Sequence, residues 1–230
     1  MKLLCLSTAE QGCSLAIVDG NVLVCEEFWE ARLTHSRRLV KMIAHMLENR
    51  AFMALDGMDG FVAARGPGSF TGLRIGISVV KGLAYAMGKP AAGVSSLDGI
   101  AFRFDHSSIP VCAMMDARRN EVYCAVYHFD HGRLISKTRE MVVSPEDAIG
   151  MTNGPAVFAG SGSKAYQDII EQTADNPEFA HGFLDSVSAT ALLRSLGPKE
   201  DFFNCPENRL DPVYIRQSDA QLQFAEKQGY

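Results

Sequence analysis

The sequence predicts a mixed α/β fold made of two similar lobes. Three strand-like runs joined by tight turns open the chain, and helical and strand-like segments alternate after them. A second strand–turn–strand pattern begins near residue 111, where the order of the first half starts again. Sheets flanked by helices are the usual result of such an order. A chain of 230 residues is long enough to form two lobes that each bury a core.

The first half changes from strand-like runs to a helical period. After the opening strands, apolar residues at three- and four-residue intervals predict a helix over 34–49, which Thr34 or Ser36 would cap. A buried strand ending in a glycine turn then leads into a predicted helix over 69–87. The other predicted elements of this half are strands 2–8, 14–20, 21–29, 60–68 and 90–96 and a short helix over 97–104.

The second half repeats this opening. Two runs around a charged turn, VCAMMDARRNEVYCAVYHFD, predict a hairpin, and a strand-like run follows it. A meander followed by alternating helices and strands is typical of an RNase H-like, actin-like (ASKHA) lobe. Periodicity alone predicts only a mixed α/β fold, and two such lobes, each with a mixed sheet flanked by helices, would use this length over 1–104 and, smaller, over 105–230. The later predicted elements are helices 145–151, 164–173 and 188–196 and strands 156–162 and 212–216.

The composition excludes several classes of function. A net charge of −5 argues against binding nucleic acid unaided, because neutralising phosphates takes a surplus of lysine and arginine. The first apolar stretch is too short for a signal peptide and no run would span a bilayer, so we expect a cytoplasmic protein without membrane contact. The six cysteines lack metal or redox spacing and are expected to be buried free thiols.

The stretch from Arg65 to Gly72 joins a strand to a helix and is rich in glycine. Backbone N–H groups at such a turn favour an anion, so a phosphate cradle is one interpretation. A Walker A loop, however, needs a lysine followed by serine or threonine, whereas Leu73 follows Gly72. We favour the other interpretation, a strand-to-helix turn capped by Ser69 or Thr71.

The predicted helix over 69–87 carries apolar surface on two sides, although one core needs only one side. Each interior glycine costs about 0.5–1 kcal/mol against alanine, a cost that a close backbone approach offsets. Contact with a partner and burial inside the chain's own core both stay open. The first face comprises Leu73, Gly76, Ile77, Val80, Leu83, Ala84 and Met87, and the second Gly72, Ile75, Val79, Gly82 and Ala86.

Other candidate sites are weak. His35 and His45 do not share a helical face well, and His128 and His131 flank a hairpin tip that lacks further ligands. Asp116 lies beside two arginines and is expected to serve a turn or an ion pair. The glycines and serines of Gly160-Ser161-Gly162-Ser163 precede a predicted helix and form a weak candidate cradle for an anion. We therefore assign no catalytic, cofactor-binding or metal-binding residue.

The segment GPGSFTGLRIG, residues 66–76, resembles a signature of the TsaB (YeaZ) family. Other stretches resemble the family in the same order along nearly the whole chain: LLCLSTAEQGCSLAI, KGLAYAMGKPAAGVSSLDGIA, DARRNEVYCAVY and DPVYIR. The resemblance implies two actin-like lobes, of which the first is the better formed.

The resemblance also implies a role beside an enzyme. Family members form a heterodimer with TsaD, which transfers threonylcarbamoyl to N6 of adenosine 37 in tRNAs reading ANN codons. A TsaE-like ATPase joins the full complex, tRNA is bound only through it, and ATP and a metal ion belong to partner subunits. Helices 34–49 and 69–87 would contact the partner, or a second copy in a homodimer when the partner is missing. The expected interface residues are Leu39, Met42, Ile43, Met46, Gly72, Leu73, Gly76, Ile77, Val80 and Leu83.

Two departures from the catalytic relatives favour a non-catalytic chain. Where TsaD-like enzymes read GVHHLEGH, with a metal-binding histidine pair, this chain reads GVSSLDGI over 93–100. Serine and isoleucine do not replace imidazole at a transition metal. The acidic residue usual in the first strand is here Ser7, which removes a handle for Mg²⁺. The alternatives are a vestigial metallopeptidase-like or weakly nucleotide-binding ATPase-like enzyme, or a nucleotide held at the subunit junction.

Overall fold

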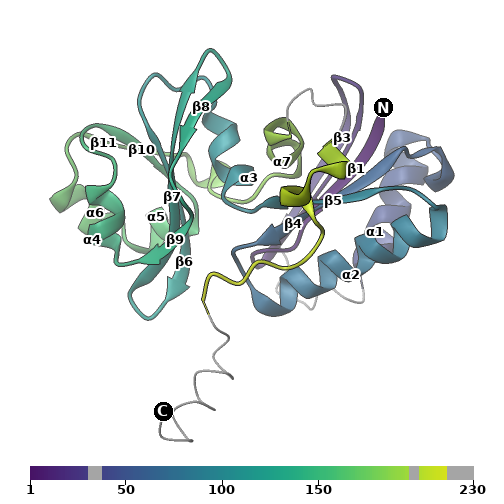
Figure 1. Ribbon diagram of the computed structural model, residues 1–230, viewed down its shortest axis with the longest axis horizontal. Coiled ribbons are helices and arrows are strands. Elements are labelled where there is room, and N and C mark those ends of the chain that lie inside the picture. The colour runs from purple at the N-terminus through teal and green to yellow at the C-terminus, as the bar shows by residue number, and fades with distance from the viewer. Residues whose placement is uncertain (31–37, 197–201, 217–230) are drawn as a thin grey trace, which may run out of the picture.

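The computed structural model describes residues 1–30, 38–196 and 202–216. Two sheets, each flanked by helices, form two lobes that lie side by side (Figure 1). The larger buried apolar cluster fills the first lobe and continues through the junction to one face of the second sheet. A smaller cluster fills the far side of the second sheet. The two lobes are therefore packed against each other through a shared core.

The first sheet has the strand order β3-β2-β1-β4-β5. Its first three strands form an antiparallel meander, whereas β4 and β5 run parallel to β1. Most residues of β1 and β4 are buried whichever face they point to, which explains why both sequences are almost continuously apolar. The bounds are β1 Lys2–Ser7, β2 Gly12–Asp19, β3 Val22–Glu30, β4 Gly60–Gly66 and β5 Ala91–Ser95.

Helices cover both faces of the first sheet (Figure 1). Two neighbours on β3 show this, because successive side chains of a strand point to opposite faces. Glu26 accepts a hydrogen bond from Ser188, the N-cap of α7, whereas Glu27 pairs with Arg50 at the end of α1. α1 and α2 therefore lie on one face, and α3 and α7 on the other. The bounds are α1 Leu39–Met46, continued by a π-helical turn Leu47–Ala51, α2 Phe70–Met87, α3 Asp98–Ala101 and α7 Ala189–Ser195.

The second sheet repeats the strand order of the first sheet and adds one strand, β9. Its order is β11-β10-β6-β7-β8, with β9 also paired to β7. β6, β7 and β8 form the meander, and β10 and β11 run parallel to β6. The predicted fold class, two RNase H-like lobes with mixed sheets, is thus confirmed. The bounds are β6 Val111–Arg118, β7 Glu121–Asp130, β8 Arg133–Lys137, β9 Met141–Val143, β10 Ala156–Ala159, β11 Pro177–Phe179, α4 Pro145–Gly150, α5 Ser161–Ala165 and α6 Gln167–Thr173.

Several predicted elements differ from the structure. Within the described residues the predicted helix 34–49 begins at Leu39, and its proposed caps Thr34 and Ser36 lie outside them. The predicted strand 212–216 joins no sheet and ends in a bend. The predicted helix 97–104 is α3 followed by a 3-10 turn, Phe102–Phe104.

Part of the predicted second lobe, 105–230, packs against the first lobe instead. α7 packs against β1, β2 and β4 as well as against α3. The 3-10 turns Phe202–Asn204 and Pro206–Asn208 pack against β5. The periodicity of α7 predicts that one side of the helix is buried, but it does not predict which of the two sheets covers that side. The predicted boundary at 104/105 therefore marks only the first point at which the chain passes from one lobe to the other.

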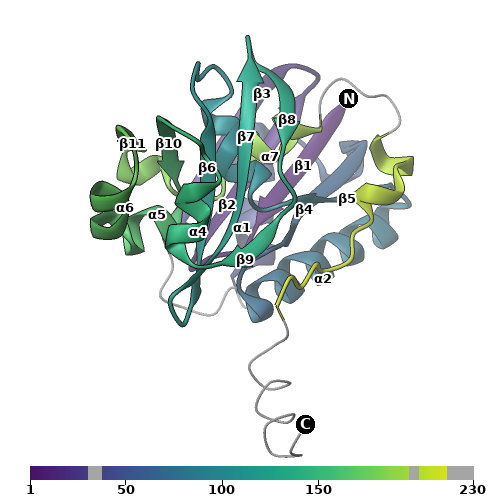
Figure 2. The ribbon, with the colours of Figure 1, turned by 60° about the vertical axis from the view of Figure 1, so that its left-hand side comes forward.

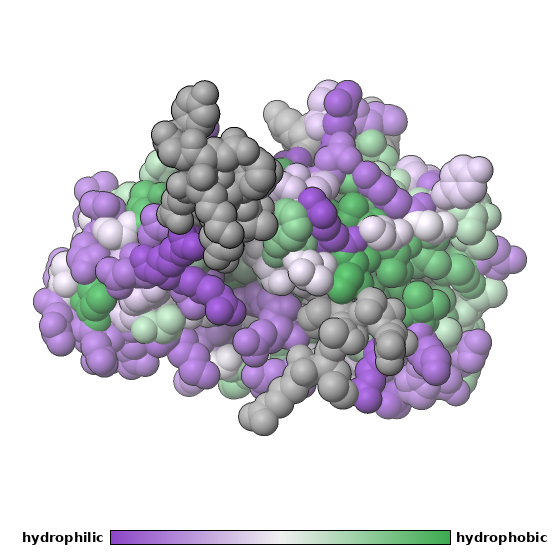
Figure 3. Space-filling view, turned by 90° about the horizontal axis from the view of Figure 1, so that it is seen from below, coloured by the Kyte–Doolittle hydropathy of each residue, from purple (hydrophilic) through white to green (hydrophobic). Residues whose placement is uncertain are grey.

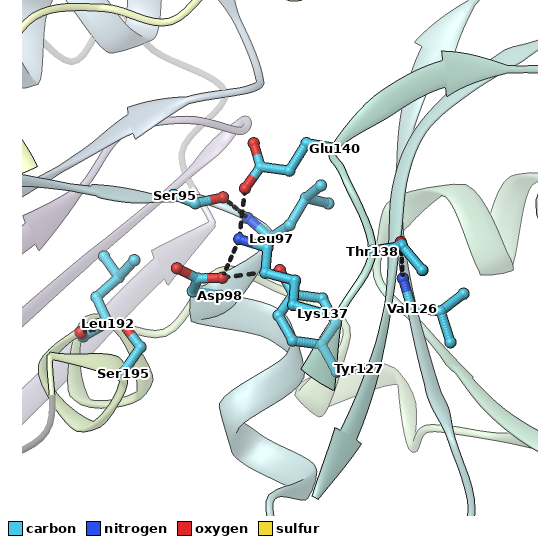
Figure 4. Close-up of polar contacts among 10 residues, drawn as sticks. All are labelled: Ser95, Leu97, Asp98, Val126, Tyr127, Lys137, Thr138, Glu140, Leu192 and Ser195. Atoms are coloured by element: carbon cyan, nitrogen blue, oxygen red, sulfur yellow. Dashed lines mark hydrogen bonds and ion pairs between the residues drawn. The ribbon is translucent and has the colours of Figure 1, made fainter. Parts of the chain in front are cut away.

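A polar cluster joins the two lobes at α3 (Figure 4). Lys137 on β8 donates hydrogen bonds to Asp98 and to Glu140, both at 2.7 Å, and the Tyr127 hydroxyl donates to Asp98 at 2.8 Å. Burial favours the neutral amine of Lys137, but the two carboxylates outweigh it and raise the pKa of Lys137. Asp98 is therefore the acceptor through which the second sheet is tied to the first lobe.

We expect Asp98→Ala to lower the free energy of unfolding by about 2–3 kcal/mol, because it leaves the Tyr127 hydroxyl and one N–H of Lys137 without an acceptor. Glu140→Ala is the matched control, since Lys137 then keeps Asp98 and the loss should be smaller. Urea denaturation of both variants measures the difference. Equal losses in the two variants would contradict the assignment of Asp98 as the central acceptor.

Candidate functional site

The glycine turn before α2 is filled by the chain itself. The Ser69 hydroxyl accepts a hydrogen bond from the Gly72 N–H at 3.2 Å, so Ser69 is the N-cap. The N–H of Ser69 donates in turn to the carbonyl of Ala9 at 2.7 Å. Because these N–H groups are engaged within the chain, the geometry favours a capped strand-to-helix turn over a phosphate cradle.

Two glycines of α2 bring the helix against the end of β1. A Cβ at Gly72 would collide with the carbonyl oxygen of Thr8, and a Cβ at Gly76 would collide with the Thr8 hydroxyl. The same hydroxyl donates a hydrogen bond to the carbonyl of Gly72 at 2.7 Å. The glycine content of this helix predicts that another segment approaches it closely. At Gly72 and Gly76 that segment belongs to the chain itself, at Thr8.

Burial corrects most of the predicted interface. Eight of its ten residues lie in the core of the first lobe, because the face that they form points at the sheet. A residue enclosed in this core is out of a partner's reach while the lobe stays folded, so burial argues against these residues as contacts. The eight are Leu39, Ile43, Met46, Gly72, Leu73, Gly76, Ile77 and Val80, whereas Met42 and Leu83 are half-buried.

Apart from Gly72, which is buried, the second apolar face of α2 is the one that solvent reaches. Ile75 and Val79 are half-buried, and Gly82 and Ala86 are exposed. A Cβ at Gly82 would meet nothing within 4 Å, so the close approach that a glycine permits is unused there. Figure 3 shows a broad hydrophobic area over the first lobe on this side. We call the following residues the α1–α2 face: Val40, Ala44, Ile75, Val79, Gly82, Leu83 and Ala86.

The apolar period of the sequence indicates most of the α1–α2 face. Ile75, Val79, Gly82 and Ala86 belong to the second apolar side of the predicted helix. Val40, which is 55% exposed, and Ala44 are not among the expected interface residues, because the period of α1 alone does not separate its inner from its outer residues.

The positions that the resemblance aligns with metal-binding histidines are enclosed in this chain. Ser96 and Ile100 are both fully buried, and Ser7 is 3% exposed. Within residues 1–30, 38–196 and 202–216, no group of three His, Cys, Asp or Glu side chains could hold a metal ion. All six cysteines are free, and burial raises the pKa of Cys13 to about 12.

The second candidate cradle, at Gly160-Ser161-Gly162-Ser163, is also occupied by groups of the chain. The N–H of Gly160 donates to the Asp185 carboxylate at 3.0 Å. The Ser163 hydroxyl donates to the carbonyl of Gly160 at 2.8 Å, and the Ser161 hydroxyl accepts from the N–H of Asp116 at 3.3 Å. The loop therefore carries a carboxylate of its own at the position proposed for an external anion.

A second carboxylate, Glu10, lies beside this loop at the lobe junction, where it accepts a hydrogen bond from the Val187 N–H at 3.0 Å. Burial raises the pKa of Glu10 above its ordinary value of 4.5. The folded chain then holds this proton to higher pH than the unfolded chain does, so folding loses stability as pH rises from 4.5 through the folded pKa.

We expect Glu10→Gln to gain stability relative to the parent chain over that same interval of pH and to hold a constant difference above it. Urea denaturation between about pH 4 and pH 8 measures this. Glu48→Gln, at an exposed position, is the control. A difference between Glu10→Gln and the parent that does not change with pH would contradict the raised pKa.

Two lobes whose sheets share this strand order define a protein of the actin-like (ASKHA) fold. No helix of its described residues is long and apolar enough to span a membrane. A family model described as "TsaD: tRNA N6-adenosine threonylcarbamoyltransferase" matches residues 29–201.

Relatives of known sequence or structure cover most of the chain. The tRNA threonylcarbamoyladenosine biosynthesis protein TsaB of Bacillus subtilis is 27% identical over 99% of this chain and 100% of its own length. TsaB of Haemophilus influenzae is 33% identical over 78% of this chain and 80% of its own. The solved structure of YeaZ from Pseudomonas aeruginosa has a TM-score of 0.77 and 31% identity, and covers 93% of this chain and 99% of that one. The chain belongs to the TsaB (YeaZ) family.

Proposed function

We propose that the chain is a non-catalytic subunit that binds and activates a TsaD-like enzyme. That enzyme would transfer threonylcarbamoyl to N6 of adenosine 37 in tRNAs reading ANN codons. The observation that carries the proposal is the α1–α2 face: an apolar surface on two adjacent helices, with Gly82 open for close packing. Apolar surface left exposed on a folded domain marks a site of contact with another protein.

A partner of the same architecture suits this face. The family model that matches the chain is described by the name of a TsaD enzyme, which supports a common ancestry of the two subunits. A related lobe would present its own pair of helices, and two such pairs pack as a four-helix bundle with ridges seated in grooves. Gly82 would let the backbones approach closely at the centre of that bundle. The chain alone would form a homodimer through the same face.

The chemistry of transfer is assigned to the partners. Ser96 and Ile100 stand where the catalytic relatives carry histidines, and both side chains are fully buried. ATP and a metal ion would accordingly be held by the TsaD-like subunit and by a TsaE-like ATPase, and tRNA would bind through the assembled complex. A chain with a net charge of −5 is poorly suited to hold tRNA by itself.

Reconstitution tests this proposal. The purified chain alone should transfer no threonylcarbamoyl to tRNA, whereas the TsaD-like subunit with the ATPase should require the chain for full activity. Metal analysis and calorimetric titration with ATP test the rival enzyme. Transfer by the isolated chain, or a stoichiometric metal together with tight ATP binding, would overturn the proposed role.

A further inference from the structure

A C-terminal segment of the chain crosses from the first lobe to the second along α2. We call residues 209–216 the strap. Figures 1 and 2 show it, in yellow, beside α2 on the lower side of the molecule and leading toward the second sheet. The strap follows the 3-10 turns that pack on β5 and ends at the β6–β7 hairpin. No strand or helix forms in it, so side-chain and single backbone contacts hold it in place.

The first set of contacts anchors the strap to β4 and β5. The N–H of Val213 donates to the carbonyl of Arg65 at 2.7 Å. The Val213 carbonyl lies 2.5 Å from the position that a Cβ of Gly66 would take, and Gly66 has a φ of +120°. The carbonyl of Arg209 lies 2.8 Å from the corresponding position at Gly93. Both glycines therefore make room for the backbone of the strap.

The second set of contacts anchors the strap to the polar side of α2, next to the α1–α2 face. Arg74 donates from Nε to the Tyr214 hydroxyl at 2.9 Å. The rings of Tyr214 and Phe70 lie 4.8 Å apart, and the guanidinium of Arg74 lies 3.9 Å above the Phe70 ring. Lys81 pairs with Asp211 at 2.9 Å, but both groups are exposed, so this ion pair contributes little.

The third contact joins the strap to the second lobe. One guanidinium nitrogen of Arg216, Nη1, donates to the carbonyl of Ala117 and to the Glu121 carboxylate, both at 3.0 Å. These two acceptors flank the tip of the β6–β7 hairpin. Three consecutive residues of the tip, Arg118, Arg119 and Asn120, have φ of 62°, 56° and 60°. Residues other than glycine disfavour this left-handed backbone conformation, so the hairpin tip needs support from its surroundings.

We propose that the strap couples the α1–α2 face to the β6–β7 hairpin, so that a partner seated on α2 also restrains the hairpin. This inference rests on the proposed function for the identity of that partner. The physical reason is a short run of contacts with three anchors. Val213 is hydrogen-bonded to β4, Tyr214 contacts α2, and Arg216, two residues after Tyr214, is hydrogen-bonded to the hairpin. The Asp98–Lys137 cluster ties the lobes at α3 and β8, away from the strap, so the strap is a separate connection between them.

Hydrogen exchange of the hairpin amides, residues 116–121, tests the coupling. In the isolated parent chain these amides should exchange slowly, and Arg216→Ala should speed them by tenfold or more. Lys81→Ala is the matched control, because it removes one exposed cationic contact of the same strap, and it should leave them unchanged. Exchange as slow in Arg216→Ala as in the parent would overturn the coupling.

The second arm adds the TsaD-like subunit at saturating concentration, with its affinity measured in the same samples. Binding should slow exchange at 116–121 in the parent chain and should not do so in Arg216→Ala. An intact complex that leaves the parent's hairpin amides unprotected, or protects them equally in both chains, overturns the coupling but leaves the proposed function standing. Failure of the parent chain to bind the subunit overturns the proposed function instead.

Discussion

Val79→Glu should weaken binding of the TsaD-like subunit by about 100-fold or more, while the chain stays folded. Val79 lies on the α1–α2 face and is half-buried in the free chain, where a glutamate side chain can turn to water. In the complex the same carboxylate would be enclosed by apolar helices without a partner, which costs several kcal/mol. Calorimetric titration measures the affinity, and thermal unfolding of the free chain shows whether it has folded.

Two further variants make this result specific. Ile135→Glu also places a carboxylate at an exposed branched side chain, 64% accessible, but on β8 of the second lobe. It should bind the partner normally. Ile77→Glu buries the charge in the core, where Ile77 is 4% exposed, and should unfold the first lobe. If Val79→Glu binds as tightly as the parent chain, the α1–α2 face is not the contact and the proposed function loses its main support.

Gly82→Leu should have opposite effects on the free chain and on the complex. In the free chain a Cβ at this exposed position meets no atom within 4 Å, and removing a helix glycine stabilises folding by about 0.5–1 kcal/mol. In the complex the added side chain would separate two closely packed helices, and overpacking of this kind costs about 1–3 kcal/mol. We expect a higher melting temperature together with an affinity that is about 10- to 100-fold lower.

Gly76→Ala is the matched variant at a glycine of the opposite side. Its Cβ would collide with the Thr8 hydroxyl, so we expect the free chain to lose about 1–3 kcal/mol of stability. Thermal and urea unfolding of the two variants provide the comparison. Equal changes in stability at the two positions would contradict the different roles of Gly76 and Gly82. A complex unaffected by Gly82→Leu would contradict close packing at this point of the face.

Gly76 and Gly82 show what a helical period predicts about α2 and what it leaves open. The 3.6-residue period placed Gly76 and Gly82 on different sides of one helix, and the structure agrees. The same period assigned the interface to Leu73, Ile77 and Val80, which are buried in the first lobe. A helical pattern gives the angle between two apolar sides, but both sides have the same composition. The helical pattern therefore does not predict which of the two apolar sides faces the sheet.

Local sequence patterns are enough to predict most of the strands and helices in their order, the repeat of the lobes and the two apolar sides of α2. Apolar periodicity and turn residues are local properties, so these features can be predicted from neighbours in the chain. The folded structure is needed to show that Thr8 fills the space beside Gly72 and Gly76, whereas the space beside Gly82 stays open. It also shows that α7 returns to the first sheet and that Arg216 reaches the β6–β7 hairpin. These contacts join residues far apart in the chain, and no local pattern records the partner of a buried side chain.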